Sequence, residues 1–256
     1  MKKIVLSSLA AAALAVGTLH AQPIASDNAG NYSGGWTNGA NGGIGFLAWS
    51  INAPQGTGSS GNFIGDPNSA GITGMGTQAF GLYANPLASG ASVSADRQFA
   101  AALNVGETFS FQWGNNWDTD GGNKGFDLYS GGTGGTQLLN VNMAGFPGDI
   151  TFNGGNTAIA SGTGPSTWSF TLSTATSLSV TATARNGTPT IAFSTNITIG
   201  SAPNAVRFYA SELGAGDNRQ PYFNNLNVVP EPSTYALLAL SAVGLAGYAA
   251  RRRARK

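Results

Sequence analysis

Thr108-Phe109-Ser110-Phe111-Gln112-Trp113 alternates large aromatic side chains with small or polar ones. Successive side chains of a β-strand point to opposite faces, so this alternation predicts a strand with one buried and one hydrated face. The same period of two recurs along the chain, and it predicts an all-β domain. The other segments with this pattern are residues 47–51, 126–128, 139–143, 150–152, 168–172, 178–184, 197–199 and 226–228.

Glycine-rich turns separate these predicted strands. Asn-Gly and Asp-Gly pairs favour two-residue hairpin loops because both residues adopt positive φ readily. Such pairs occur at residues 38–39, 41–42, 120–121, 153–154 and 186–187. Many short strands with turns of this kind predict a single antiparallel β-sandwich or jelly-roll domain over residues 22–229. A right-handed β-helix is the alternative architecture.

Hydrophobic segments lie at both ends of the chain. Lys2 and Lys3 precede an apolar run over residues 4–16, which suits a signal-peptide core of about 7–15 residues. We predict a signal helix over residues 1–21 with cleavage after Ala21, and cleavage after Gly17 is the alternative. The uncharged segment 235–250 predicts a short transmembrane helix, and the basic residues after it are expected to stay in the cytoplasm. Both ends therefore place residues 22–229 outside the cytoplasm.

The segment 230–256 combines three signals in a fixed order. The triplet Pro230-Glu231-Pro232 comes first, the apolar segment 235–250 follows, and a cluster that includes Arg251, Arg252 and Arg253 ends the chain. This arrangement resembles the PEP-CTERM sorting signal of exported bacterial proteins.

The resemblance implies a route through the cell. It implies recognition by exosortase, a membrane-embedded sorting protease, and cleavage near the Pro-Glu-Pro triplet. The precursor would be anchored in the inner membrane by residues 235–250, and the product would reach the cell surface or the extracellular space. The resemblance also implies an exopolysaccharide and biofilm context, but it assigns no activity to the domain upstream.

Composition excludes several classes of function. The chain has no cysteine, and its single histidine, His20, lies in the predicted signal peptide. The domain therefore has no thiolate, no imidazole metal ligand and no Ser-His-Asp triad. Seven of the 12 Lys and Arg residues and one of the 11 acidic residues lie outside residues 22–229, so this stretch carries a net charge near −5. Such a charge does not suit nucleic acid as a partner.

The remaining enzymatic routes are a carboxylate pair or a lysine or tyrosine mechanism. Glu107 and Glu212 are the only glutamates between residues 22 and 229, and nothing in the sequence brings them together. We therefore expect no enzymatic activity. The expected function is that of an exported surface or extracellular-matrix protein of structural or adhesive type. A lectin-like carbohydrate-binding module is the alternative, with a polysaccharide-active enzyme behind it.

Oxygen ligands are closely spaced in the loop that contains Asp118, Asp120, Asn123 and Asp127. Calcium prefers such ligands, although the loop departs from the EF-hand pattern at the glycine and at the final glutamate position. The other interpretation is a polar hairpin whose Asp and Asn side chains cap the turn. We favour the hairpin, which needs no cofactor, and keep calcium as the hypothesis for this loop.

Aromatic side chains in turn-rich sequence are candidates for contact with a polysaccharide. Trp36 and Trp117 lie among Gly, Asn and Asp residues, so we predict that their indoles are exposed and stack on sugar rings. The other interpretation is that the tryptophans belong to the core, as the alternation around Trp49 and Trp113 indicates for those two residues.

Overall fold

A computed structural model describes residues 22–116, 121–145, 149–159, 164–185 and 190–230, together with residues 241, 244, 245, 247, 248 and 251. The chain divides into two compact units, Ile24–Val228 and a second unit made of Met1–Pro23 and Val229–Lys256. The predicted signal helix over residues 1–21 lies outside the described residues. Within the described part of the chain, no helix has the length and apolar character needed to cross a membrane. Most of the predicted transmembrane segment, residues 235–250, also lies outside that part.

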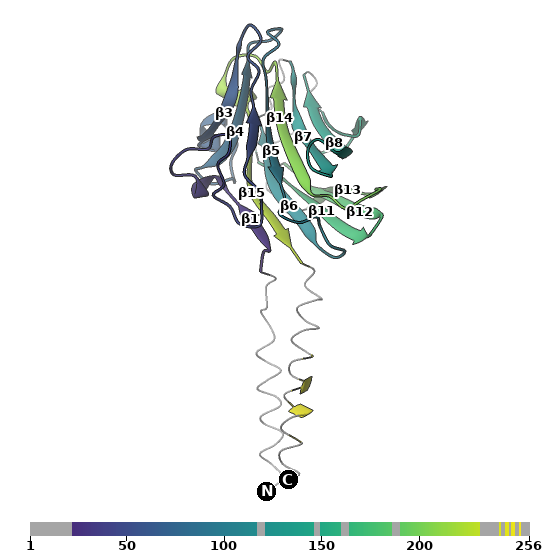
Figure 1. Cartoon of the computed structure of the whole chain (residues 1–256). Coiled ribbons are helices and arrows are strands. Elements are labelled where there is room, and N and C mark those ends of the chain that lie inside the picture. The colour runs from purple at the N-terminus through teal and green to yellow at the C-terminus, as the bar shows by residue number, and fades with distance from the viewer. Residues whose placement is uncertain are drawn as a thin grey trace. The chain divides into compact units, whose positions relative to one another are not determined.

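The prediction of an all-β sandwich is confirmed, because the unit Ile24–Val228 consists of two antiparallel sheets (Figure 1). The eight-stranded sheet has the order β13-β12-β11-β6-β15-β4-β3, with β1 paired to β15. The seven-stranded sheet has the order β10-β9-β8-β7-β14-β5-β2. The strand pairings of the described residues are antiparallel, which rules out the β-helix alternative there.

The strands of the eight-stranded sheet are β1 (Ala25–Asp27), β3 (Ser59–Gly65), β4 (Ala79–Asn85), β6 (Thr108–Asn115), β11 (Ser166–Thr174), β12 (Ser177–Thr183), β13 (Ile191–Thr198) and β15 (Pro221–Val229). Those of the seven-stranded sheet are β2 (Ser50–Asn52), β5 (Ser92–Gln98), β7 (Asn123–Ser130), β8 (Thr136–Ala144), β9 (Ile150–Phe152), β10 (Gly155–Asn156) and β14 (Ala205–Ser211). The short 3-10 helices are η1 (Ala29–Asn31), η2 (Pro67–Ala70) and η3 (Asp217–Arg219).

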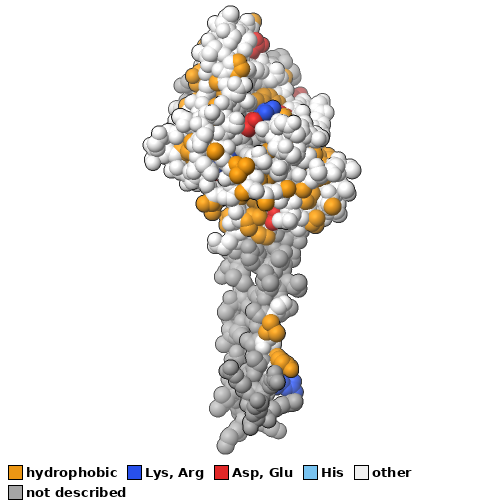
Figure 2. Space-filling view, in the orientation of Figure 1, with side chains coloured by type: hydrophobic (Ala, Val, Ile, Leu, Met, Phe, Trp, Pro, Cys, Tyr) orange, Lys and Arg blue, Asp and Glu red, His pale blue; other side chains and the backbone are white. Residues whose placement is uncertain are grey.

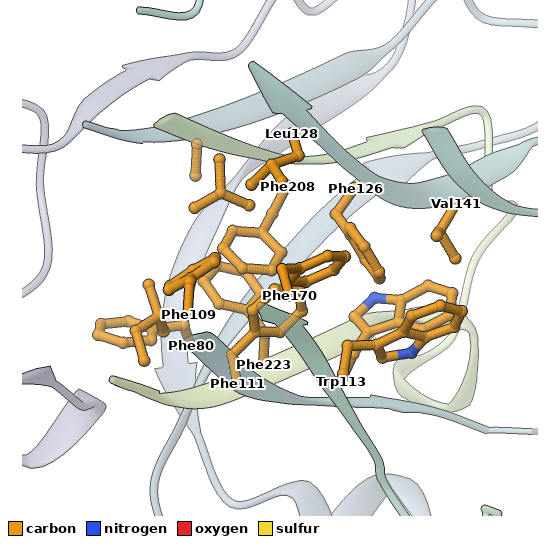
Figure 3. Close-up of a cluster of buried hydrophobic side chains, with 14 of the residues drawn as sticks. Phe80, Phe109, Phe111, Trp113, Phe126, Leu128, Val141, Phe170, Phe208 and Phe223 are labelled. Atoms are coloured by element: carbon orange, nitrogen blue, oxygen red, sulfur yellow. The ribbon is translucent and has the colours of Figure 1, made fainter. Parts of the chain in front are cut away.

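Aromatic side chains fill the space between the two sheets (Figure 3). Phe109, Phe111 and Trp113 of β6 are at most 1% exposed, as the alternation in this strand predicts. They meet rings from the opposite sheet, and Phe111 packs edge-on against Phe208 of β14 with 4.9 Å between ring centroids. Because each ring removes a large apolar area from water, this layer is the main source of stability of the sandwich.

Turn chemistry follows the sequence at some positions and departs from it at others. Asn153 and Gly154 both have positive φ, 49° and 81°, and they join β9 to β10 as the predicted hairpin. The Asn-Gly pairs at residues 38–39 and 41–42 are not hairpin turns between named strands, since they lie in the long connection from η1 to β2. The predicted strand over residues 47–51 is also shorter than expected, because β2 begins at Ser50 and Leu47 is 47% exposed.

An ion pair lies inside the sandwich, where the sequence predicts apolar side chains. Arg97 alternates inward on β5 and meets Asp27 of β1, with 2.7 Å between Nη2 and Oδ2 and both side chains fully buried. The Tyr32 hydroxyl donates to the same carboxylate at 2.7 Å. Burial raises the pKa of Tyr32 to about 12, and its hydrogen bond to Asp27 adds to this shift. This cluster ties the first strand of the domain to the opposite sheet.

The first and last strands of the domain are neighbours. β1 pairs antiparallel with β15, so that Ala25 lies opposite Val228. The backbone N–H of Ile24 donates to the carbonyl of Val228 at 2.8 Å. The two ends of the unit Ile24–Val228 therefore leave the sandwich at one place.

Candidate functional site

The outer face of the seven-stranded sheet carries a connected group of polar side chains, here called the polar face. It originates from the alternation of β14, an interior strand of this sheet. Val206 and Phe208 of β14 point into the core and are at most 1% exposed, whereas Arg207 and Tyr209 point outward and are half-buried. Because β14 lies between β5 and β7, its outward side chains reach partners on both neighbours.

Arg207 lies opposite an aspartate on each neighbouring strand, Asp96 of β5 and Asp127 of β7. It pairs with Asp96 through two parallel bonds, Nε to Oδ1 and Nη2 to Oδ2, each 2.8 Å long. This bidentate geometry fixes the guanidinium in one plane. The hydrogen bonds to Asp96 raise the pKa of Arg207, so its charge persists at any physiological pH.

Asp127 receives other donors in place of Arg207. Its Oδ1 accepts from Asn140 at 2.8 Å and from Gln137 at 3.0 Å, and its Oδ2 accepts from the Tyr129 hydroxyl at 3.2 Å. Burial raises the pKa of the Asp127 carboxyl, although the hydrogen bonds from Asn140 and Tyr129 oppose the shift. The guanidinium of Arg207 also stands 5.3 Å over the Tyr129 ring, a cation–π contact that joins both aspartates into one network.

Tyr209 extends this network to β8 by crossing a glycine. Gly125 of β7 lies opposite Tyr209, and a Cβ at this position would lie 2.6 Å from the Tyr209 hydroxyl oxygen. The missing side chain lets the phenol reach β8, where its hydroxyl accepts from Asn140 at 2.8 Å and donates to Asn142 at 2.9 Å. Burial raises the pKa of Tyr209, so the phenol stays neutral and can both donate and accept.

A shallow depression of about 210 Å³ adjoins Tyr209 on this face. Small polar side chains surround it, among them Asn52, Ser92, Ser94 and Ser211. Hydroxyl and amide groups both donate and accept hydrogen bonds. The depression therefore offers mixed hydrogen-bonding partners without net charge.

Charge is sparse over the polar face. Figure 2 shows mainly neutral side chains and backbone there, with one adjoining pair of basic and acidic groups over β5 and β14. That pair is neutral as a whole because the two charges satisfy each other. A ligand would meet hydrogen-bonding groups here, and not a field that selects for a strongly charged molecule.

The calcium hypothesis is not supported at the two ligands that the structure describes. Asn123 and Asp127 point to the same face of β7 but stand four residues apart. This spacing separates them by about 13 Å along a strand, whereas calcium ligands lie about 2.4 Å from a shared ion. Asp127 instead accepts hydrogen bonds in the polar face. Asp118 and Asp120 lie outside the described residues, and the described residues contain no group of three acidic side chains that could hold a metal ion.

The predicted exposure of Trp36 is wrong. Trp36 is 4% exposed, and its ring packs against Trp49, Phe80 and Phe223 with centroid distances of 5.2, 4.7 and 5.7 Å. These aromatic neighbours enclose the indole in the core, so it cannot stack on a sugar ring. Trp117, the other predicted stacking residue, lies outside the described residues.

The sorting residues follow the last strand without a linker. Pro230 comes directly after β15, and Arg251 is exposed in a helical segment. The remaining predicted sorting residues, Glu231, Pro232, Arg252 and Arg253, lie outside the described part of the chain. The triplet therefore begins two residues after Val228, which is hydrogen-bonded to Ile24.

Comparison with solved structures finds similarities at low sequence identity. The globular domain of T. cruzi calreticulin is 11% identical, with a TM-score of 0.45, over 77% of this chain and 90% of that chain. The cellulose-induced protein Cip1 is 10% identical, with a TM-score of 0.46, over 80% and 96% of the two chains. The exoplasmic/lumenal domain of VIP36 in its metal-free form is 10% identical, with a TM-score of 0.42, over 82% and 93%. With TM-scores below 0.5, these similarities carry no information on ligand or activity.

No curated protein matches the chain in a sequence comparison. A family model does match its C-terminus, over residues 228–253, and the family is described as the PEP-CTERM protein-sorting motif. The match contains the Pro-Glu-Pro triplet and the arginine cluster, and it confirms the resemblance drawn from those residues. The chain carries a PEP-CTERM protein-sorting motif at its C-terminus.

Proposed function

We propose that this protein is an exported, non-enzymatic surface or extracellular-matrix protein of structural or adhesive type. The sorting motif at residues 228–253 implies an exported protein and a processing step by exosortase. The polar face supports the adhesive role, because it offers neutral hydrogen-bonding groups to a hydroxyl-rich polymer such as an exopolysaccharide. We also assign the sandwich to the jelly-roll type, since β4, β5, β6 and β7 alternate between the two sheets.

The proposed route begins with a precursor held in the inner membrane by residues 235–250. Exosortase then cleaves near Pro230 and delivers the domain to the cell surface or to a biofilm matrix. Adjacent chain ends support this route, because Ile24 and Val228 leave the sandwich together.

The proposal of no enzymatic activity rests on how the glutamates are used. Glu107 accepts from the backbone N–H and the amide of Asn104, at 2.8 and 2.9 Å, in a loop before β6. Glu212 accepts from the backbone N–H of Gly90 at 2.8 Å. Both carboxylates thus hold loops in place, and glycoside hydrolysis needs a pair that faces one substrate.

The second candidate function, a carbohydrate-binding module, is favoured by one observation. The depression of about 210 Å³ beside Tyr209 adjoins a network in which the Tyr209 hydroxyl is held by Asn140 and Asn142. Preorganised polar groups lose little entropy on binding, which favours specific recognition over loose adhesion. The ligand class would be a neutral oligosaccharide.

Retention on the exopolysaccharide of the producing cells tests both functions. Ser94→Trp fills the depression on the seven-stranded sheet with a large ring, whereas Ser179→Trp adds the same ring to the outward side of β12 in the other sheet. We expect the wild type and Ser179→Trp to be retained in affinity electrophoresis, and retention of Ser94→Trp to fall about tenfold.

Equal retention of the two variants would refute a role for the polar face. No retention of the wild type would refute the adhesive function itself. Mass spectrometry of the mature termini tests the route separately, since an uncut C-terminus at Lys256 in the surface fraction contradicts processing.

A further inference from the structure

Polar side chains gather inside one end of the sandwich, in a group that the proposed function does not use. Trp113 and Asn115 point inward from the end of β6, and Ser166 and Trp168 point inward from the start of β11. Ser166 lies directly opposite Trp113. Arg185 follows β12 and donates through Nη2 to the backbone carbonyl of Asn115. We call these five residues the donor cluster.

The donor cluster is buried, and several of its polar atoms lack a partner among the described residues. All five side chains are at most 2% exposed. Within the described part of the chain, six of their atoms have no hydrogen-bond partner: Nε1 of Trp113, Nε1 of Trp168, Oγ of Ser166, Nε of Arg185, and Nδ2 and Oδ1 of Asn115. Buried polar groups in folded proteins almost always find partners, because each unpaired one destabilises the fold. Five of these six atoms are hydrogen-bond donors, so the missing partner is a hydrogen-bond acceptor.

The positive charge of Arg185 indicates that the missing acceptor is an anion and not a water molecule. Two other arginines, the buried Arg97 and the half-buried Arg207, each face an aspartate. Arg185 is 2% exposed, and none of the ion pairs found among the described residues includes it. A buried cation without a counter-charge is strongly destabilising, and water satisfies its hydrogen bonds without neutralising its charge.

The guanidinium of Arg185 remains protonated at neutral pH. Burial lowers the pKa of Arg185 to about 10, which is still well above neutral pH. The guanidinium is therefore charged under physiological conditions and needs an anion close to it.

Aromatic packing shapes the surroundings of the cluster. The two indoles pack edge-on against the same ring, Phe126 of β7, with centroid distances of 5.5 Å for Trp113 and 5.2 Å for Trp168. Their N–H groups thus belong to one apolar layer, where a charge–dipole interaction is stronger than in water. Such a layer excludes bulk solvent and favours a small ligand that sheds its hydration easily.

We propose that the donor cluster binds a small, weakly hydrated monovalent inorganic anion such as chloride. The guanidinium of Arg185 neutralises the charge, and the hydroxyl of Ser166 and the indole N–H groups complete the shell of donors. The anion supplies the counter-charge that the described residues do not provide, so it acts as a structural ion of the sandwich.

Chloride binding can be read at the site itself. The full chain, labelled with ¹⁵N and held in detergent micelles, is titrated with chloride against fluoride at constant ionic strength. We expect the indole N–H signals of Trp113 and Trp168 to shift with a single saturable dissociation constant. The indole of Trp49 is the internal control, because it already donates to the Tyr32 hydroxyl at 2.8 Å and should not move.

Thermal unfolding gives a second readout. A ligand that binds only the folded chain raises Tm, by roughly 5–10 °C at a concentration about 100 times its Kd for a domain of this size. Arg185→Gln should abolish the chloride-dependent rise, and Arg207→Gln, which removes a paired arginine on the outer face, should leave it unchanged.

Two results would overturn the proposal. The first is that neither indole N–H signal, of Trp113 or of Trp168, shows a saturable shift while the protein is folded. The second is an equal Tm in chloride and in fluoride for the wild type. Since both measurements are made on the wild type, failure of Arg185→Gln to fold would not prevent the test.

Discussion

The ion pair between Asp27 and Arg97 allows a quantitative test of how burial controls the strength of a contact. Arg97 and its neighbour Asp96 are consecutive residues of β5 and point to opposite faces. The inward pair, Asp27 with Arg97, has both side chains 0% exposed at 2.7 Å. The outward pair, Asp96 with Arg207, has side chains 11% and 31% exposed at 2.8 Å. Both pairs join an arginine to an aspartate at nearly the same distance. The outward pair is bidentate, and the inward pair is the more deeply buried.

We predict that Asp27→Asn lowers the free energy of unfolding by about 3–5 kcal/mol. The change leaves the guanidinium of Arg97 inside the sandwich without its counter-charge, and a buried charge that loses its partner destabilises a protein by this amount. Burial already lowers the pKa of Arg97, and Asp27 opposes that shift, so its removal increases the destabilisation. The control Asp96→Asn should lower the free energy of unfolding by about 1 kcal/mol or less, because water screens a partly exposed pair.

Thermal unfolding of the full chain in detergent micelles measures both variants. A domain of this size loses about 2–4 °C in Tm per kcal/mol, so we expect a fall of roughly 6–20 °C for Asp27→Asn and at most about 4 °C for Asp96→Asn. High salt should reduce the effect of Asp96→Asn and leave that of Asp27→Asn unchanged, since salt does not penetrate the core. Equal losses for the two variants, or an equal response to salt, would refute the argument that burial decides the difference.

Three further predictions concern single side chains. Gly125→Ala should destabilise the domain by about 1–3 kcal/mol, because the added Cβ would meet the Val141 carbonyl and the Tyr209 hydroxyl. The control Gly134→Ala has open space around it and should change the free energy of unfolding in urea by no more than about 0.5 kcal/mol. Equal effects of the two variants would contradict the role of Gly125. The pKa of Asp127, followed by carboxyl ¹³C NMR, should lie above its ordinary value because the carboxyl is buried. Arg207→Gln should raise this pKa further, since the guanidinium lowers it in the wild type. A lower pKa of Asp127 in the variant would contradict the prediction. Burial raises the pKa of Tyr32 from its ordinary value to about 12, so the stability that this group contributes is fully present below about pH 10 and is lost as the pH rises through about 12. Tyr32→Phe should therefore lose less stability than the wild type over this pH range. Identical profiles of stability against alkaline pH for the two proteins would disprove the assignment.

The alternation of side chains and the residue types at turns predicted the all-β fold class and several of its elements. Phe109, Phe111 and Trp113 are buried on one side of β6, as their period of two predicts, because a strand separates odd and even residues onto two faces. The turn at Asn153 and Gly154 also followed from residue type, since both adopt positive φ. The sorting motif was identifiable for a similar reason: its three signals are contiguous in the chain and need no fold to bring them together.

The candidate site was much less predictable. Of the polar face, only Asp127 and Asn123 were singled out from the sequence, and for a different role. Asp96 and Arg207 are separated by 111 positions, and their pairing depends on β5 and β14 being neighbours in one register. An inward arginine is likewise invisible in a pattern of alternation until its partner is known, as Arg97 and Arg185 show.

The sequence by itself determined several strands with their buried faces, such as β6 and β11, and the C-terminal sorting motif, because each depends on residues that are close in the chain. Only the tertiary structure decided that Trp36 is core, that Asp127 is a hydrogen-bond acceptor in the polar face, and that Arg185 is buried with no counter-charge among the described residues. The physical reason is that burial and pairing are set by which strands become neighbours. That choice depends on the free energy of the whole sandwich and not on any one segment.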